Sequence, residues 1–164
     1  MSESSHDIVV IGGGIHGAGV VQAAAAAGYR TLLLEKEGLA HGTSSRSSKL
    51  IHGGLRYLET LQFSLVQESL GERAILLRIA PHLVRLIPFY VPVYRGTLRR
   101  PWQIRIGLSL YALLGGLRKE SLFRSVPKDQ WTDLDGLDPS GLQSIFQYWD
   151  AQTDDAELTR GVVG

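Results

Sequence analysis

The sequence predicts an α/β fold that begins with a β-α-β unit, and three features near its N-terminus support this prediction. Residues 8–11 form a short, β-branched apolar run, which is typical of a buried strand. Residues 15–27 favour a helix because they include five consecutive alanines, and residues 31–34 form a second apolar run. The turn between the first strand and the helix carries three glycines in the spacing G-x-G-x-x-G: Gly12, Gly14 and Gly17.

This arrangement is typical of a Rossmann-like, dinucleotide-binding unit. Gly12 allows a sharp turn, Gly14 lets a pyrophosphate approach the backbone, and Gly17 lets the helix pack closely on the strand. The helix N-terminus offers free N–H groups and a partial positive charge to phosphates. Glu35 ends the second strand, where it would accept hydrogen bonds from both ribose hydroxyls and repel a 2′-phosphate, which argues against NADP. This fingerprint leaves both NAD and FAD open.

The rest of the chain alternates helical and extended patterns. Helices are predicted where apolar residues recur at three- and four-residue steps, and strands where apolar runs lie between turn signals. The predicted elements are a loop at 38–49, a helical turn at 55–60, a helix at 63–80, a strand at 89–94, a helix at 102–114, turns with a short helix at 126–138, a strand at 144–149 and a helix at 154–163.

Individual residues support these boundaries. The helix at 63–80 should bury one face and end at Pro81, which cannot continue it. The apolar residues of that face are Phe63, Val66, Leu70, Ala74 and Leu77. Pro92 indicates that the next strand lies at a sheet edge. The pair Asp138-Pro139 signals a turn, and acids in the first turn favour the last helix.

The composition suits a soluble globular domain: 164 residues, 44% of them apolar, with a mean hydropathy near zero. The net charge of +1 gives no reason to expect a nucleic-acid partner. The absence of cysteine excludes disulfides, thiolate catalysis and cysteine metal sites, and we predict no metal site. The short polar start, MSESSHD, is not a secretory signal, so we expect a cytoplasmic location.

Charge is distributed unevenly along the chain. Residues 73–119 hold nine Arg or Lys and no acid, whereas residues 120–164 hold nine acids and three bases. One interpretation is a basic face that pairs with an acidic one; the other is a basic surface for an anionic substrate or a membrane. Residues 98–117 place basic side chains around Trp102, in an apolar segment too short to span a bilayer. These basic residues are Arg99, Arg100 and Arg105.

A second functional pattern follows the first unit, in residues 42–59, which read GTSSRSSKLIHGGLRYLE. Its hydroxyls and glycines could line phosphates through backbone and side-chain donors. His52, Arg56 and Tyr57 offer a titratable base, a fixed cation and a phenol within six residues. The alternative is an ordinary polar loop with a structural histidine.

Five segments together resemble FAD-dependent glycerol-3-phosphate dehydrogenases, in the order that family shows. These segments are GGGIHGAG, LLLEK, GTSSRSSKLIHGGLRYLE, RIAPHLV and YWDAQTDDAEL. The resemblance implies FAD as cofactor and a FAD-binding fold of the D-amino-acid-oxidase type. It also implies oxidation of sn-glycerol 3-phosphate to dihydroxyacetone phosphate, with electrons passed to a membrane quinone.

The resemblance assigns roles to matching positions. Residues implied at the adenosine diphosphate part are Gly12, Gly14, Ile15, Gly17, Glu35 and Lys36. Residues implied along the pyrophosphate and flavin are Thr43, Ser44, Ser45, Ser47, Ser48 and Leu50. Residues implied at the substrate are His52, Arg56 and Tyr57, with His52 as the candidate base that takes the hydroxyl proton.

Two alternatives stay open: a glycerol-3-phosphate oxidase that uses oxygen, and a flavin-binding fragment without turnover. We expect the chain to be the N-terminal part of a longer enzyme, because a dinucleotide-binding sheet normally has more strands. Within it we assign 5–60 to the dinucleotide and flavin loop, 61–143 to an insertion and 144–164 to the start of a substrate domain. The expected complete enzyme is peripheral on the cytoplasmic face of the inner membrane, and a homodimer is left open as its assembly.

Overall fold

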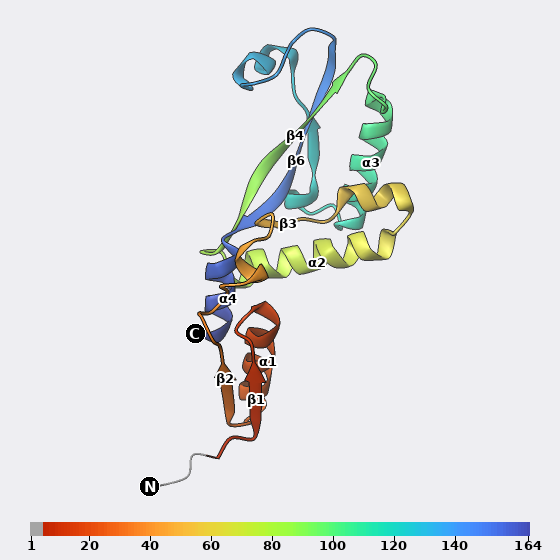
Figure 1. The fold of residues 1–164 in the computed structure, drawn as a ribbon. Coiled ribbons are helices and arrows are strands. Elements are labelled where there is room, and N and C mark those ends of the chain that lie inside the picture. Colours follow the sequence, from red (N-terminus) through yellow and green to blue (C-terminus); the bar gives the residue numbers. More distant parts are fainter. Residues whose placement is uncertain (1–4) are drawn as a thin grey trace. The chain divides into compact units, whose positions relative to one another are not determined.

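The computed structural model describes residues 5–164, which divide into two compact units (Figure 1). The first unit contains the described residues up to Leu50 together with Thr153–Gly164, and the second contains Ile51–Gln152. The predicted domain limits at 60 and 143 concern the complete protein and stay a prediction.

The first unit is the predicted β-α-β unit followed by a loop and the last helix. Its elements are β1 (Ile8–Ile11), α1 (Ile15–Ala26), β2 (Thr31–Leu34), a 3-10 turn (Thr43–Ser45) and α4 (Asp155–Val163). The two strands are parallel, with Ile8 opposite Thr31 and Ile11 opposite Leu34. Gly28, just past α1, has φ +89°, as its predicted place after the helix requires.

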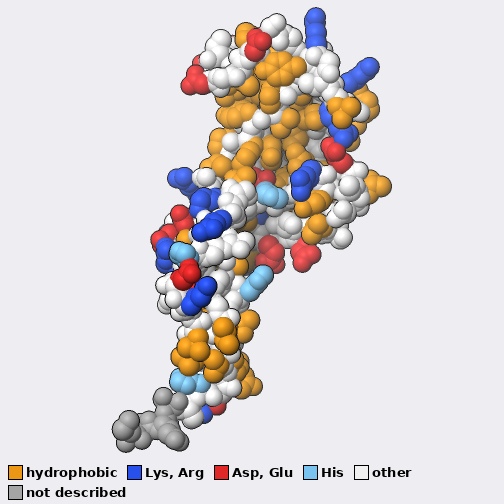
Figure 2. Space-filling view, viewed as in Figure 1, with side chains coloured by type: hydrophobic (Ala, Val, Ile, Leu, Met, Phe, Trp, Pro, Cys, Tyr) orange, Lys and Arg blue, Asp and Glu red, His pale blue; other side chains and the backbone are white. Residues whose placement is uncertain are grey.

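Apolar side chains on this two-stranded sheet remain open to solvent. Val9 is 53% exposed, Ile11 86% and Leu34 47%. A complete dinucleotide-binding sheet contains more strands, and strands of this type are normally buried on both faces. Figure 2 shows hydrophobic side chains exposed over this part of the chain.

The second unit combines a twisted sheet with two helices. Its elements are β3 (Leu50–Ile51), a 3-10 turn (Leu55–Thr60), α2 (Phe63–Ile79), β4 (Val84–Tyr94), α3 (Pro101–Leu114), a 3-10 turn (Lys119–Ser121), β5 (Phe123–Ser125), a 3-10 turn (Lys128–Asp133) and β6 (Leu142–Thr153). The strand order is β3-β6-β4, and β5 pairs antiparallel with β6. Since β4 ends this order, the edge position predicted from Pro92 is confirmed.

Two strands were predicted too short, and two were not predicted. β4 begins five residues before the predicted start, because its pairing continues past Pro88, which the sequence pattern treats as an interruption. β6 extends on both sides of the predicted 144–149, since a polar residue on an exposed strand position does not stop pairing. The short strands β3 and β5 were not predicted at all.

The core of the second unit consists of two clusters. The first contains Val66, Leu70 and Tyr111, and the second contains Val93, Leu108 and Phe146. Val66 and Leu70 belong to the predicted apolar face of α2, so this face is confirmed at its centre. At the N-terminal end of α2, Phe63 is 38% exposed. Figure 2 shows hydrophobic side chains covering the visible face of β4 and β6.

Candidate functional site

Two of the three fingerprint glycines, Gly12 and Gly17, have a local geometry that requires glycine. Gly12 has φ +105°, and its N–H donates to the carbonyl oxygen of Leu34 at 2.8 Å, which ties the turn to β2. A Cβ on Gly17 would lie 1.9 Å from the backbone oxygen of Gly12, so close helix–strand packing depends on the missing side chain. A Cβ on Gly14 would lie 3.1 Å from the hydroxyl oxygen of Ser44.

Glu35 turns its carboxylate toward the glycine turn. Its Oε2 accepts a hydrogen bond from the N–H of Gly13 at 2.6 Å, and its Oε1 accepts from the N–H of Glu37 at 3.0 Å. The Gly13 contact, and then the Glu37 contact, hold the pKa of the Glu35 carboxyl below its ordinary value. The side chain is therefore an ionised acceptor at neutral pH, as ribose recognition requires. Lys36 beside it is exposed and pairs with Glu37 at 3.5 Å.

The glycine turn, the acid and the serine-rich loop line one cavity of about 540 Å³ in the first unit. Its lining residues are Gly14, Glu35, Lys36, Glu37, His41, Gly42, Thr43, Ser44 and Arg46. At its edge, the hydroxyl of Ser44 accepts the N–H of Ile15 at 2.9 Å, so the loop contacts the first turn of α1. The cavity thus combines the start of α1 with the hydroxyls of Thr43 and Ser44 and the cationic side chains of Lys36 and Arg46, a lining that suits a phosphorylated ligand.

The other predicted loop residues have different surroundings. Ser45 donates to the carbonyl oxygen of Gly42 at 3.1 Å, and Ser48 is exposed. Leu50 is half-buried in β3. The cofactor-binding roles of these residues stay predictions.

Sequence reasoning missed a clamp that fastens the loop to α4. The carboxylate of Asp155 accepts the N–H of Ser47 at 3.0 Å and the ammonium of Lys49 at 2.5 Å. The Lys49 side chain, and then Ser47, lower the pKa of the Asp155 carboxyl well below its ordinary value. Asp154 caps the same helix by accepting the N–H groups of Ala156 and Glu157, both at 3.0 Å.

This clamp predicts a specific response to acid. Because the pKa of Asp155 is lowered on folding, its stabilising effect is present above the unfolded pKa of about 3.9 and is lost as the pH falls below it. We expect Asp155→Asn to lower the melting temperature at neutral pH, and this difference from the parent to shrink below about pH 4. Glu157→Gln, which removes an exposed pair with Arg160, is the control and should change little. A difference that persists unchanged into acid would contradict the role of the clamp.

The second unit holds the three residues predicted at the substrate. Exposed His52 directly precedes the buried Gly53 and Gly54, and Arg56 and Tyr57 follow in the 3-10 turn. The guanidinium carbon of Arg56 lies 5.4 Å from the centre of the Tyr57 ring. This cation–π contact keeps the two side chains next to each other. All three residues lie in the second unit, and the predicted cofactor residues lie in the first unit.

The hydrogen bonding of His52 determines its tautomer. Its Nδ1 accepts the N–H of Gly54 at 3.1 Å. A neutral imidazole that accepts at Nδ1 carries its proton on Nε2, so here the ring presents a donor at Nε2. The predicted role as base therefore requires that the Gly54 hydrogen bond opens, which frees Nδ1 or allows the other tautomer.

A buried polar network below this segment was also missed. Arg73 of α2 is 0% exposed, and its Nη1 donates to Asp150 Oδ1 at 2.5 Å and to the carbonyl oxygen of Trp149 at 2.9 Å. The hydroxyl of Tyr111 lies 3.1 Å from the same Oδ1. Burial raises the pKa of the Asp150 carboxyl, and the Arg73 guanidinium opposes that rise. This pair joins one residue of the base-rich segment to one residue of the acid-rich segment.

The signal for this network was present in the sequence. Arg73 follows Val66 and Leu70 at helical spacing, so a charge lies on the apolar face of α2. A buried arginine requires an acid or several carbonyl oxygens around it. The sequence did not indicate which acid would pair with it, because Asp150 is 77 positions away.

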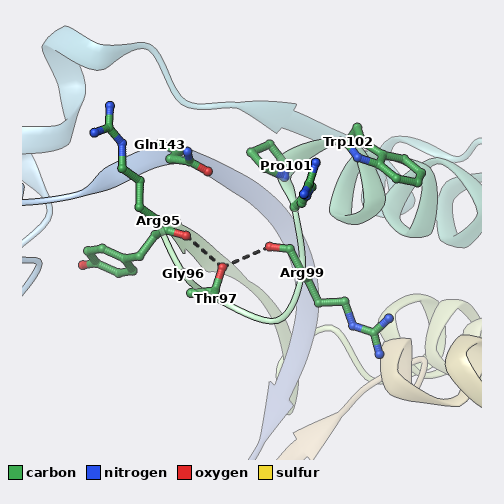
Figure 3. Close-up of a pocket in the computed structure, with 9 residues that line it drawn as sticks. Arg95, Gly96, Thr97, Arg99, Pro101, Trp102 and Gln143 are labelled. Carbon is green, nitrogen blue, oxygen red and sulfur yellow. Dashed lines mark hydrogen bonds between the residues drawn. The ribbon is translucent and has the colours of Figure 1, made fainter.

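A larger cavity of about 710 Å³ lies between β4 and the start of α3 (Figure 3). Arg95, Thr97, Trp102 and Gln143 are among the residues around it. The hydroxyl oxygen of Thr97 lies 2.9 Å from the carbonyl oxygen of Tyr94 and 3.0 Å from that of Arg99, and these two carbonyl groups share its single hydrogen. None of the predicted substrate residues lines this cavity.

The glycine turn with an acid after the second strand defines a dinucleotide-binding protein. The chain belongs to the FAD dependent oxidoreductase family, whose model matches residues 7–164. These findings confirm the predicted D-amino-acid-oxidase-type fold, and FAD is the cofactor of the family.

Curated relatives indicate a more specific class of similar enzymes within this family. The chain is 47% identical over 152 residues to the aerobic glycerol-3-phosphate dehydrogenase of Escherichia coli (strain K12), covering 93% of this chain and 29% of that protein. It is 46% identical over 158 residues to D-erythritol 1-phosphate dehydrogenase of Brucella abortus (strain 2308), covering 93% of this chain and 30% of that protein. The resemblance to glycerol-3-phosphate dehydrogenases is therefore confirmed.

A solved structure shows the same fold. The glycerol-3-phosphate dehydrogenase of Bacillus halodurans, complexed with FAD, matches with a TM-score of 0.58 and 31% sequence identity. The match covers 99% of this chain and 25% of that chain. The chain thus spans less than a third of the length of the relatives it matches.

Proposed function

We propose that this chain forms the FAD-binding part of an enzyme that oxidises sn-glycerol 3-phosphate to dihydroxyacetone phosphate. The observation that carries the proposal is a short segment with His52, Arg56 and Tyr57, in which Arg56 contacts the Tyr57 ring, in a chain whose relatives are named glycerol-3-phosphate dehydrogenases. A second relative is named for another polyol phosphate, so a phosphorylated polyol is the substrate class that both names share.

The residues of the first unit fit FAD. We propose that the N–H groups of the glycine turn and of α1 hold the pyrophosphate, while Glu35 accepts the ribose hydroxyls. The support is geometric: Gly17 leaves no room for a Cβ, and the ionised Glu35 lies on the same cavity as Gly14. Bound FAD would supply the acceptor for a hydride.

We propose that residues of the second unit bind the substrate and take up its hydroxyl proton. Oxidation of a secondary alcohol removes a hydride from carbon and a proton from the hydroxyl, and we propose that His52 takes that proton. The guanidinium of Arg56 is always charged and matches the planar arrangement of phosphate oxygens. Tyr57, held beside Arg56, would orient the substrate.

Two measurements test this function and its acceptor. Denaturing the complete protein should release FAD, because we propose a non-covalent cofactor. Turnover with glycerol 3-phosphate should reduce a quinone analogue faster than it forms hydrogen peroxide. Peroxide as the main product would support the oxidase alternative, and no turnover with any polyol phosphate would overturn the proposal.

We propose in addition that α3 contacts a membrane surface peripherally, which would bring the enzyme to its quinone. Over residues 5–164, no helix has the length and hydropathy needed to cross a bilayer. One side of α3 nevertheless exposes an apolar row at helical spacing: Trp102 is 59% exposed, Ile106 57% and Leu113 60%. Arginines flank the start of this row, as an interfacial helix on anionic lipid requires (Figure 3).

Flotation of the complete protein with anionic liposomes tests this surface. Replacing Arg100 and Arg105 with Gln should reduce binding by about fivefold per residue, because each basic residue near the surface contributes about 1 kcal/mol. Arg99 is left in place because it pairs with Glu59 at 2.7 Å. The control is Ile79→Gln, which removes an apolar side chain exposed elsewhere. Equal flotation of the parent and the double variant would contradict the proposal that α3 contacts the membrane.

A further inference from the structure

The buried network of the second unit has no direct part in the proposed chemistry. Its members are Arg73, Tyr111 and Asp150, whose exposed fractions are 0%, 1% and 2%. A buried ion pair is costly to desolvate, and well-packed apolar residues in its place are often neutral or stabilising. Packing alone therefore does not explain why charged and hydroxyl groups lie at this place in the core.

The network reaches the segment that carries His52 through one backbone group. The N–H of Gly53 donates to the hydroxyl oxygen of Tyr111 at 3.0 Å and lies 3.3 Å from Asp150 Oδ1. A Cβ on Gly53 would lie 2.4 Å from that hydroxyl and 2.4 Å from the Cδ2 of Leu70. The absence of a side chain is thus what lets the backbone approach the network.

Gly54 connects the fixed backbone of Gly53 to the imidazole of His52. Gly54 has φ +66°, a conformation that L side chains rarely adopt, and a Cβ there would lie 2.4 Å from the ring of Tyr57. The N–H of Gly54 then donates to Nδ1 of His52 at 3.1 Å. The network, the two glycines and the imidazole form one continuous chain of contacts.

We propose that Tyr111, held by the Arg73–Asp150 pair, is a positioning residue that fixes Gly53 and thereby sets the orientation and tautomer of His52. Arg73 is itself fixed by further bonds, from Nη2 to the carbonyl oxygen of Glu120 at 3.0 Å and to the hydroxyl of Ser121 at 3.2 Å. The catalytic part of this inference rests on the proposed function; the structural part does not.

The first test uses hydrogen exchange in the complete protein without substrate. Tyr111→Phe keeps the ring and removes the nearer acceptor of the Gly53 N–H, which leaves only Asp150 Oδ1 at 3.3 Å. The peptide N–H groups around Gly53 and Gly54 should therefore exchange about fivefold faster. The matched control is Tyr148→Phe, whose ring lies 6.0 Å from that of Tyr111 in the same cluster but whose hydroxyl is not the partner of Gly53. Unchanged exchange in Tyr111→Phe, or an equal change in Tyr148→Phe, overturns the inference.

The second test is a double-mutant cycle on flavin reduction by glycerol 3-phosphate. Tyr111→Phe should lower the limiting rate about fivefold, because the lost orientation of the imidazole outweighs the easier opening of the Gly54 hydrogen bond. The substrate dissociation constant should change little. The same substitution made in His52→Ala should have almost no effect, because a positioning residue acts through the group it positions. An equal rate loss in both backgrounds would show a structural role and overturn the inference.

The two tests separate this inference from the proposed function. A parent protein whose flavin glycerol 3-phosphate does not reduce would contradict the proposed function. The exchange measurement would still decide whether Tyr111 fixes the His52 segment, because it needs no substrate.

Discussion

Replacing His52 with alanine in the complete protein is expected to slow flavin reduction by glycerol 3-phosphate by about 100- to 10,000-fold. The reason is that the substrate hydroxyl would lose the group proposed to take its proton. Flavin content should stay near that of the parent, because His52 lies in the second unit, whereas the proposed phosphate and ribose contacts lie in the first.

A glutamine at this position separates two roles for His52. The amide of glutamine can donate a hydrogen bond as Nε2–H does, but it cannot take up a proton. If His52 acts as a base, His52→Gln should be nearly as slow as His52→Ala. Recovery of most of the rate in His52→Gln would assign His52 a donor role, which the Gly54 hydrogen bond already favours in this structure. If the rates of both variants are within about threefold of the parent rate, His52 has a structural role and no catalytic one.

Replacing Arg73 with methionine is expected to lower the free energy of unfolding by about 3–5 kcal/mol, because Asp150 would remain buried without its partner. Both side chains are almost completely excluded from solvent, so water cannot replace the lost contact. Chemical denaturation of the complete protein, followed by a probe in the second unit, would measure this loss.

The control removes both charges together. Arg73→Met combined with Asp150→Leu leaves no uncompensated charge, and we expect it to recover most of the stability lost in Arg73→Met. If the double variant is as unstable as Arg73→Met, then the hydrogen bonds from Arg73 to the carbonyl oxygens of Trp149 and Glu120 contribute more than the ion pair.

The local parts of this fold could be predicted from the sequence, and the long-range parts could not. The β-α-β unit, its glycine turn and the acid at the end of β2 lie within about thirty consecutive residues, where hydrophobic pattern and turn chemistry decide the structure. The helical turn before α2 and the end of α2 before Pro81 follow from equally local rules.

Contacts between distant residues left only weak signals. Ser47 and Asp155 are 108 positions apart, and no periodicity relates them. Arg73 on an apolar helix face did indicate a buried charge, but Asp150 lies in a strand of mixed polar and aromatic residues that gave no sign of a partner. Strand lengths failed for a similar reason, since the extent of β6 depends on its neighbours β3 and β4, which lie far away in the sequence.

The most direct test of the central proposal is anaerobic addition of glycerol 3-phosphate to the complete, purified protein. The proposal predicts that the protein carries FAD and that the visible absorption of the oxidised flavin bleaches on addition, whereas plain glycerol at the same concentration leaves it unchanged. A protein that purifies without flavin, or a flavin that stays oxidised with glycerol 3-phosphate, would contradict the proposed function.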